Sequence, residues 1–481
     1  MNSATVKWSR ARPWLIGLLV LTILRLLLAA LIPLAPDEAY YWLWSRHLQP
    51  GYFDDAPLIA LWIRVGTAIA GNTPLGIRLL SPFACGVGSL LLWRAGKDFF
   101  SGDAGITAAA LLNATLIFGV GSIITTPDTP LLLFWTATLA ALGRWHVTGD
   151  DRWWVVAGLT AGMALDAKYT GLLVFMVAGV WLLSFPAGRT ALRRPLPWVG
   201  LGVGFILFLP ATIWNADNHW VSFVKQGSRS TKLDVSQFPD HFLGLVFGQL
   251  GLATPVVFVL MVVGSWCVGY SRSPAHRLVA ISTWVPALIF VEHTLSGAVQ
   301  GNWPAIVYPG AALAAAGGAP VLTQRWRIWA VSIGFAFTAA VYLQALARPI
   351  PIPAHRDPVA LQLAGWSRFV GRVAKVAHGE TIFSTDYSTA AELSIHLPRN
   401  TRLVAVGQRW KYFDLPRPAT PLAGIVVQSD RRGALSPAFF KRIQKLCTVA
   451  RTSQGSIVQT YTLYRAVLRP TTDAAVLKNR S

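Results

Sequence analysis

The hydrophobic positions of this chain form long uninterrupted runs rather than the periodic stripes of a soluble protein. The first run extends from Trp14 to near Leu34 and is long enough to cross a bilayer. It is longer than the apolar region of a signal peptide, and further runs follow it. It is therefore interpreted as the first membrane-spanning helix, preceded by the basic residues Lys7, Arg10 and Arg12.

Later segments of comparable apolarity bring the expected total to about eleven crossings. These segments are 75–97, 104–124, 130–147, 153–167, 169–186, 197–214, 241–268, 278–295, 303–320 and 328–347. The stretch 57–71 is also apolar but carries Arg64, so we expect it to form a helix that lies in the membrane interface.

The charged residues give this topology a direction. The expected cytoplasmic loops carry about twice as many Lys and Arg residues as the expected outer loops before residue 348. The N-terminus is therefore expected in the cytoplasm, and an odd number of crossings puts the C-terminal part outside. Most acidic residues of the same region fall at the outer face, which indicates a functional site there.

The pattern changes at residue 348, after which no run reaches membrane length. It predicts strands at 381–387, 402–406, 424–429 and 456–466, and helices at 358–377, 388–397 and 436–446. The expected fold class is thus a polytopic α-helical membrane protein with a small C-terminal α/β domain. Residues 1–347 would form the transmembrane catalytic domain, with a first outer loop at 35–73, and residues 348–481 a soluble outer domain.

Composition supports the membrane class. Of the 481 residues, 53% are hydrophobic and only 13% are charged, whereas soluble proteins carry about 25% charged residues. The net charge of +21 would suggest nucleic acid as a partner of a soluble protein, but in a membrane protein it reflects basic loops beside anionic lipid. Membrane lipids, and no nucleic acid, are the expected partners.

The loop after the first span carries the densest group of candidate chemistry, in the sequence APDEAYYWLWSRHLQPGYFDDAPLIALWIR. Asp37 and Glu38 come directly after the span, and Asp54 and Asp55 follow about 16 residues later. A short amphipathic helix that includes Tyr40 joins the two acidic pairs, so that both can converge on one pocket at the membrane surface. The alternative is a belt of aromatic residues with solvated acids.

Other candidates lie in the remaining outer loops. Asp128 lies in the turn TTPDTP, where a simple turn-forming acid is the alternative. Lys168 in LDAKYTG is either the partner of a structural acid or a cation that binds phosphate. Further polar or aromatic candidates at the same face are His219, Lys225, Arg229 and Trp303.

The chain contains no Walker A, GxGxxG or HExxH motif, so the sequence gives no sign of a nucleotide site. An enzyme that works outside the membrane cannot rely on cytosolic nucleotide sugars. A lipid-linked sugar would remove that need, because its apolar tail stays in the bilayer while the phosphosugar reaches the outer pocket.

These features together resemble the GT-C glycosyltransferases. The match is to the superfamily of protein O-mannosyltransferases and lipid A aminoarabinose transferases, in its bacterial branch that depends on polyprenyl phosphate. The resembling segments cover the membrane part in order and extend into the C-terminal part: 36–64, 125–135, 165–173, 214–223, 301–310 and 387–398.

The resemblance implies roles for five residues. Asp37 corresponds to the catalytic carboxylate, Glu38 to the adjacent acid, and Asp55 and Asp128 to later acidic positions of the family, while Lys168 would contact the donor phosphate. Asp37 would take the proton of a hydroxyl acceptor. No cofactor is firmly expected besides the lipid-linked donor substrate, although a divalent metal held partly by Glu38 is an option.

The implied function is inverting transfer of a hexose or pentose from a polyprenyl-phosphate donor to an acceptor of the cell envelope. Lipid A, a surface glycan or a protein would each serve as acceptor, on the periplasmic face of the bacterial inner membrane. The chain has Ala56-Pro57 where relatives often have two prolines, and it lacks the lysine that aminoarabinose transferases carry there. Two alternatives stay open: a lipid or glycan transporter or flippase, and a ligase or polymerase that uses a diphosphate-linked glycan.

Overall fold

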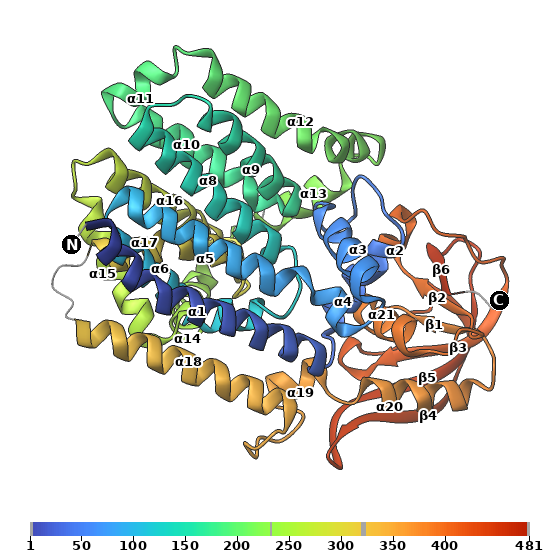
Figure 1. Cartoon of the computed structure of the whole chain (residues 1–481). Helices are drawn as coiled ribbons and strands as arrows, with labels where there is room; N and C mark the ends of the chain where they lie inside the picture. Colours follow the sequence, from blue (N-terminus) through green and yellow to red (C-terminus); the bar gives the residue numbers. More distant parts are fainter. Residues whose placement is uncertain (1–2, 231–232, 319–323, 479–481) are drawn as a thin grey trace. The chain divides into compact units, whose positions relative to one another are not determined.

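The computed structural model describes residues 3–230, 233–318 and 324–478, and the chain divides into two compact units (Figure 1). The first unit comprises Met1–Ala29, Asp55–Trp62 and Arg78–Ala340, and the second comprises Ala30–Asp54, Ile63–Ile77 and Val341–Ser481. The second unit therefore combines most of the expected first outer loop with the C-terminal segment, a grouping that the sequence pattern does not indicate.

The first unit is helical. Its helices are α1 (Ser3–Leu31), α5 (Leu80–Phe99), α6 (Gly102–Asn113), α7 (Leu116–Gly121), α8 (Asp128–Thr148), α9 (Trp153–Ala167), α10 (Leu172–Leu183), α11 (Pro186–Ala191), α12 (Pro195–Asp217), α13 (Val221–Gly227), α14 (Phe238–Ala253), α15 (Pro255–Gly269), α16 (Pro274–His293), α17 (Tyr308–Gly317) and α18 (Gln324–Leu346). The predicted helical membrane class is confirmed.

The described residues contain five helices long and apolar enough to cross a membrane, or six if the bent pair α14–α15 is one span. That pair bends by 110° at Thr254, where the following Pro255 cannot continue the hydrogen bonding of a straight helix. The sequence predicts one crossing at 241–268, and the structure shows that this segment is bent in its middle. Shorter apolar helices also occur, and the number of about eleven crossings stays a prediction.

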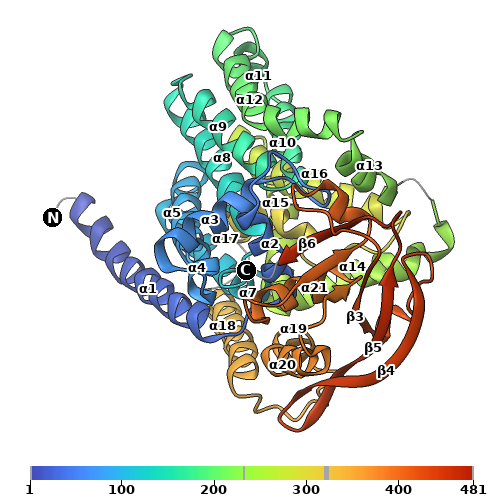
Figure 2. The same cartoon turned by 90° about the vertical axis from the view of Figure 1, so that its right-hand side faces the viewer.

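Glycines allow two helices of the first unit to approach closely. α9 packs against α12 (Figure 2), and a Cβ atom added to Gly158 would lie 1.9 Å from the carbonyl oxygen of Gly200. One turn further on, a Cβ atom on Gly162 would lie 2.6 Å from the carbonyl oxygen of Gly204. Such contacts replace the hydrophobic effect as the main source of helix association within lipid.

A buried arginine joins α1 to its neighbours in the first unit. Arg25 is 1% exposed, and its Nη1 donates a hydrogen bond to Oδ1 of Asn113 at 2.8 Å. The Asn113 amide in turn donates to Ser89 Oγ at 2.8 Å. A charge within a span is costly unless polar groups surround it, so these contacts fix the rotation of α1 against α5 and α6.

The second unit contains a six-stranded sheet with the strand order β4-β5-β3-β1-β2-β6. Its strands are β1 (Ile382–Ser384), β2 (Leu403–Val406), β3 (Leu422–Ser429), β4 (Phe440–Ser453), β5 (Ser456–Leu468) and β6 (Ala474–Lys478). The three central strands β3, β1 and β2 are parallel, and the outer pairings are antiparallel. The predicted C-terminal α/β domain is confirmed, and its carboxyl strand ends share one edge.

Helices pack around this sheet and complete the second unit. They are α19 (Pro358–Leu363), α20 (Trp366–Ala377) and α21 (Tyr387–His396), and the loop after α1 adds α2 (Pro36–Arg46), most of α3 (Leu58–Ala70) and α4 (Pro74–Arg78). α2 contacts α21 directly. An N-terminal segment and a C-terminal helix thereby form one part of the second unit, which brings Asp37, Glu38 and Asp54 beside the sheet domain.

The predicted helix at 436–446 is wrong, because this stretch leads into the edge strand β4. Phe440 pairs with Leu468 of β5, and the register then shifts twice within residues 441–447. The apolar residues Ile443 and Leu446, whose spacing suggested a helix, are 37% and 36% exposed. They form no buried face, so pairing with β5 decides the conformation over local spacing. The strand β6 was not predicted at all.

Candidate functional site

α2 begins at the predicted acidic pair. Pro36 occupies the first helical position, and Asp37 and Glu38 follow in the first turn, where acids stabilise the positive end of a helix. Glu38 is fully buried, and its Oε2 accepts the backbone N–H of Ala35 at 2.9 Å. This carboxylate therefore caps the helix and fixes the position of Asp37 beside it.

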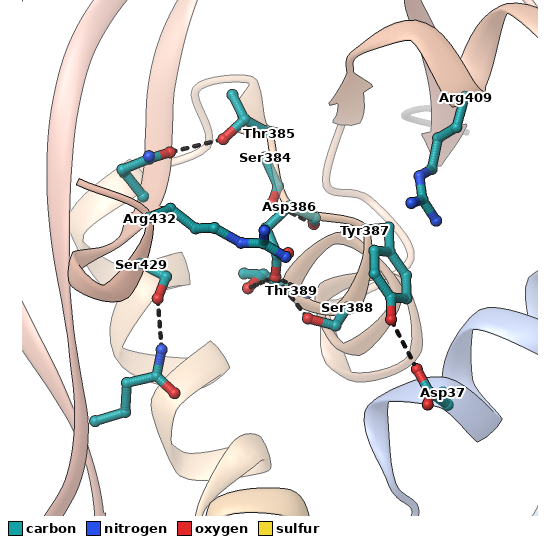
Figure 3. Close-up of polar contacts among 12 residues, drawn as sticks. Asp37, Ser384, Thr385, Asp386, Tyr387, Ser388, Thr389, Arg409, Ser429 and Arg432 are labelled. Carbon is teal, nitrogen blue, oxygen red and sulfur yellow. Dashed lines mark hydrogen bonds and ion pairs between the residues drawn. The ribbon is translucent and has the colours of Figure 1, made fainter. Parts of the chain in front are cut away.

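Asp37 points toward the sheet domain of the same unit. Its Oδ1 accepts a hydrogen bond from the hydroxyl of Tyr387 at 3.0 Å (Figure 3). Part of the side chain stays exposed, but the surrounding protein withdraws solvent from the carboxyl group, and this desolvation raises the pKa of Asp37. The hydrogen bond from Tyr387 opposes the rise, and the negative charge of Glu38 adds to it.

A second acid lies close to this contact. Asp54 Oδ2 accepts the hydroxyl of the buried Tyr40 at 2.5 Å and Nη1 of Arg409 at 2.8 Å. The Arg409 guanidinium also lies over the ring of Tyr387, 4.1 Å from its centre. Asp54 therefore neutralises the arginine, while Asp37 keeps a hydroxyl donor as its described partner and can accept a proton.

A separate acidic group lies in the first unit. Asp128, the first residue of α8, forms an ion pair with Lys168 at 2.8 Å, and both side chains are 12% exposed. The side-chain amide of Asn302 donates to the other carboxylate oxygen of Asp128 at 2.6 Å. Lys168 therefore has an acid as its partner. Asp128 and Lys168, which the sequence offers as candidates from different loops, are in direct contact.

Asp55 belongs to this first-unit group. It is 8% exposed, and its Oδ1 accepts the backbone N–H groups of Ala56 at 2.9 Å and Tyr169 at 3.4 Å. Burial raises the pKa of Asp55 to about 6, and the charge of Lys168 opposes this rise. Asp55 thus titrates within reach of neutral pH.

The remaining predicted residues lie near the ends of helices in the first unit. The guanidinium of Arg229 lies over the ring of Trp303, 5.2 Å from its centre, and Trp303 directly follows Asn302. Lys225 lies half-buried in α13. His219 is exposed with a positive φ of 58°, and no described contact joins it to Asp55, Asp128 or Lys168.

The expected option of a divalent ion finds no ready ligand set. Within residues 3–230, 233–318 and 324–478, no group of three or more His, Cys, Asp or Glu side chains is arranged to hold a metal ion. Glu38 uses one carboxylate oxygen to cap α2. A role of metal in this protein stays an untested expectation.

Sequence reasoning missed three of the residues that complete these groups. Tyr387 opens the segment 387–398 and Asn302 lies in the segment 301–310, both of which contribute to the family resemblance. Those two positions could have been singled out there. Arg409 lies in no such segment, and its role follows only from the contact with Asp54.

Comparisons with known proteins support the class of glycosyltransferases that the sequence resembles. The family model described as dolichyl-phosphate-mannose-protein mannosyltransferase matches residues 54–214. The chain is also 29% identical over 281 residues to the lipid A galacturonosyltransferase RgtD of Rhizobium johnstonii, which covers 56% of this chain. The match spans 58% of the length of that relative.

Solved structures extend the comparison to nearly the whole chain. The apo structure of ArnT from Cupriavidus metallidurans has a TM-score of 0.63 at 16% identity and covers 95% of this chain and 98% of that one. The structure of the same protein bound to undecaprenyl phosphate has a TM-score of 0.62 at 16% identity, with coverages of 94% and 98%. The predicted resemblance is confirmed: this chain has the fold of the GT-C glycosyltransferases.

Proposed function

We propose that this chain is an inverting glycosyltransferase that moves a monosaccharide from a polyprenyl-phosphate donor to a cell-envelope acceptor. The observation that carries the proposal is Asp37, a carboxylate with a raised pKa that faces a tyrosine hydroxyl rather than a cation. The relative that acts on lipid A and the ArnT structure with undecaprenyl phosphate support lipid A as acceptor and a polyprenyl phosphate as carrier.

The proposed reaction is a single displacement at the anomeric carbon. An acceptor hydroxyl attacks this carbon, the bond to the phosphate oxygen breaks, and the polyprenyl phosphate leaves with the bonding electrons. Asp37 takes the acceptor proton. A carboxylate with a raised pKa is a stronger base than an ordinary aspartate, so the environment of Asp37 suits this role.

For the first unit, we propose that Lys168 stabilises the phosphate of the donor. An ammonium group oriented by Asp128, which Asn302 also contacts, needs little rearrangement to meet a second anion. Arg229 and Lys225 would assist as further cations. The proposal also places the protein in the bacterial inner membrane, with its N-terminus in the cytoplasm and its sheet domain in the periplasm.

The decisive variant is Asp37→Asn, which keeps the shape of the side chain and removes the base. We expect transfer of labelled sugar from polyprenyl phosphate to lipid A to fall about 10²–10⁴-fold, with membrane abundance and thermal unfolding unchanged. Asp217→Asn is the matched control, because Asp217 is another exposed acid, at the end of α12.

Retained transfer in Asp37→Asn would refute the assignment of the base. Wild-type protein that transfers sugar only from a diphosphate-linked glycan would favour a ligase or polymerase. Movement of labelled lipid across vesicles without any product would favour a transporter.

A further inference from the structure

A cavity of about 310 Å³ lies within the second unit, at the carboxyl ends of the parallel strands. Thr385 and Asp386, which follow β1, form part of its wall, as do Gln428 at the end of β3 and Arg432 just beyond it. Arg409, which follows β2, completes the contribution of the three strands. Figure 3 shows most of these side chains together.

The topology of the sheet explains why a cavity forms at this point. The chain runs from β1 through α21 to β2 on one side of β1, and then returns to place β3 on the other side. The loops that leave β1 and β3 therefore diverge. In open sheets with parallel strands, ligands bind in the crevice that such a change of direction creates outside the carboxyl ends.

Asp386 is a fixed anion in the wall of this cavity. Its Oδ2 accepts Ser388 Oγ at 2.6 Å and both the N–H and the hydroxyl of Thr389, at 3.0 Å and 2.8 Å. Burial of Asp386 acts to raise its pKa, but these hydrogen bonds outweigh it and hold the pKa below the usual range. The carboxylate stays ionised and is available to orient a cation.

Arg432 is the cation that Asp386 orients. Its Nη2 contacts Asp386 Oδ1 at 2.8 Å, while its side chain remains 60% exposed. A guanidinium has five N–H donors in a planar fork, and the described contact with Asp386 engages one nitrogen. Arg409 also lines the wall, but Asp54 compensates its charge. The remaining donors of Arg432 are therefore the cationic groups that the wall offers to an anionic ligand.

Other groups in the wall suit a sugar. Thr385 Oγ1 donates to Gln428 Oε1 at 2.6 Å, which orients a hydroxyl and an amide at the cavity. The rings of Tyr387 and Phe439 supply aromatic surface. Hydroxyl and amide groups can exchange hydrogen bonds with a polyol, whereas a bare phosphate would need only the cations.

We propose that this cavity binds the saccharide part of the acceptor, a sugar that carries a phosphate or carboxylate group. The inference rests on the proposed function and names the acceptor class for it. Tyr387 connects the cavity to the proposed base, because its side chain lines the cavity and its hydroxyl donates a hydrogen bond to Asp37. A sugar held there would contact the tyrosine whose hydroxyl donates to the carboxylate that takes the proton, so the sheet domain would select the acceptor.

The test measures binding to the purified full-length protein in detergent. The probes are the bisphosphorylated glucosamine disaccharide of lipid A without its acyl chains, the same disaccharide without phosphates, and inorganic phosphate. We expect Arg432→Gln to weaken binding of the bisphosphorylated probe at least about tenfold, as expected for the loss of a charge-assisted hydrogen bond. Arg465→Gln is the matched control, because Arg465 lies on β5 outside the cavity wall and forms an exposed ion pair with Glu380.

Several results would overturn the proposal. Equal binding of the phosphate-free disaccharide would show that the cavity does not prefer an anionic ligand. Equal binding of inorganic phosphate would show that the saccharide is not recognised. Unchanged binding in Arg432→Gln would show that the probe binds outside this cavity. If Arg432→Gln does not fold, Thr385→Val carries the same test, since Thr385 lines the same wall.

Sugar transfer separates this proposal from the proposed function. In Arg432→Gln, the KM for acceptor should rise about tenfold while kcat at saturating acceptor is retained. Wild-type protein that binds the disaccharide but transfers no sugar would refute the proposed function and leave the cavity assignment standing. Full transfer by Arg432→Gln with an unchanged KM would refute the cavity assignment alone.

Discussion

The two acidic groups of this protein use the same residue types in opposite ways. In the first unit, Asp128 has a lysine as its partner, so its charge is compensated within a largely buried ion pair. In the second unit, Arg409 is paired with Asp54, and Asp37 meets a neutral tyrosine hydroxyl. A compensated carboxylate holds a cation in place, whereas an uncompensated one with a raised pKa is suited to accept a proton.

The contrast is sharpest at Asp54 and Asp55, which are consecutive in the chain. Asp54 accepts hydrogen bonds from a guanidinium and a phenol hydroxyl. Asp55 accepts them from backbone N–H groups, and burial raises its pKa to about 6. The boundary between the two units falls between these residues. Neighbouring acids of one dipeptide therefore differ in environment because they belong to different packing units.

The largest expected effect comes from breaking the compensated pair. Lys168→Met leaves Asp128 buried without its cation, which should lower the free energy of unfolding by about 3–5 kcal/mol. Transfer of sugar should fall more than about 100-fold if Lys168 also binds the donor phosphate. Thermal unfolding in detergent and the transfer assay measure the two effects separately.

The double variant Lys168→Met with Asp128→Asn distinguishes structure from chemistry. Removing both charges should restore much of the stability, because no buried charge is left alone. It should not restore transfer. A double variant with normal transfer would show that the ion pair is only structural.

A smaller effect is expected from Asp55→Asn, and it depends on pH. The folded pKa of about 6 lies above the ordinary value of an aspartate, so the folded state holds the proton more tightly than the unfolded chain. This contribution is present at low pH and is lost as pH rises from about 4 to about 6, and it amounts to about 3 kcal/mol. In Asp55→Asn, the unfolding midpoint should lose this part of its pH dependence.

Asp217→Asn provides the reference for this comparison. Because Asp217 is exposed at the end of α12, the variant should retain the wild-type pH dependence. If the unfolding midpoint of Asp55→Asn depends on pH as steeply as that of the wild type, burial does not raise the pKa of Asp55.

Much of the architecture follows from local pattern. Long apolar runs predict helices whatever they pack against. Short apolar runs predicted β1, β2 and β3, and alternation of apolar and polar residues predicted β5. The failures lie where distant contacts decide. The stretch 436–446 has the spacing of a helix, but β5 lies beside it and offers a ladder of hydrogen bonds.

The site residues could be predicted where a charged side chain beside a membrane span would be unfavourable without a partner. A lysine and an aspartate beside membrane spans must find partners, so Lys168 and Asp128 stand out from the sequence alone. Their pairing across 40 positions does not, and neither does the contact of Asp37 with Tyr387, 350 positions away. An arginine such as Arg409 is unremarkable in a basic domain until its contact with Asp54 is known.

The smallest expected effect tests the uncompensated carboxylate itself. Tyr387→Phe removes the hydrogen bond to Asp37, and transfer should fall about tenfold, the rate equivalent of one ordinary hydrogen bond. Since this hydrogen bond lowers the pKa of Asp37, its loss should raise that pKa further. The acid side of the pH–rate profile should therefore move to higher pH.

Tyr464→Phe on β5 is the control for the loss of a phenol hydroxyl in the same sheet domain. It should leave both the rate and the profile unchanged. The direction of the shift in Tyr387→Phe is the informative quantity, because a general loss of structure lowers the rate at every pH alike. A lowered rate with an unmoved acid limb would mean that Tyr387 supports the fold, and that some group other than Asp37 takes the proton.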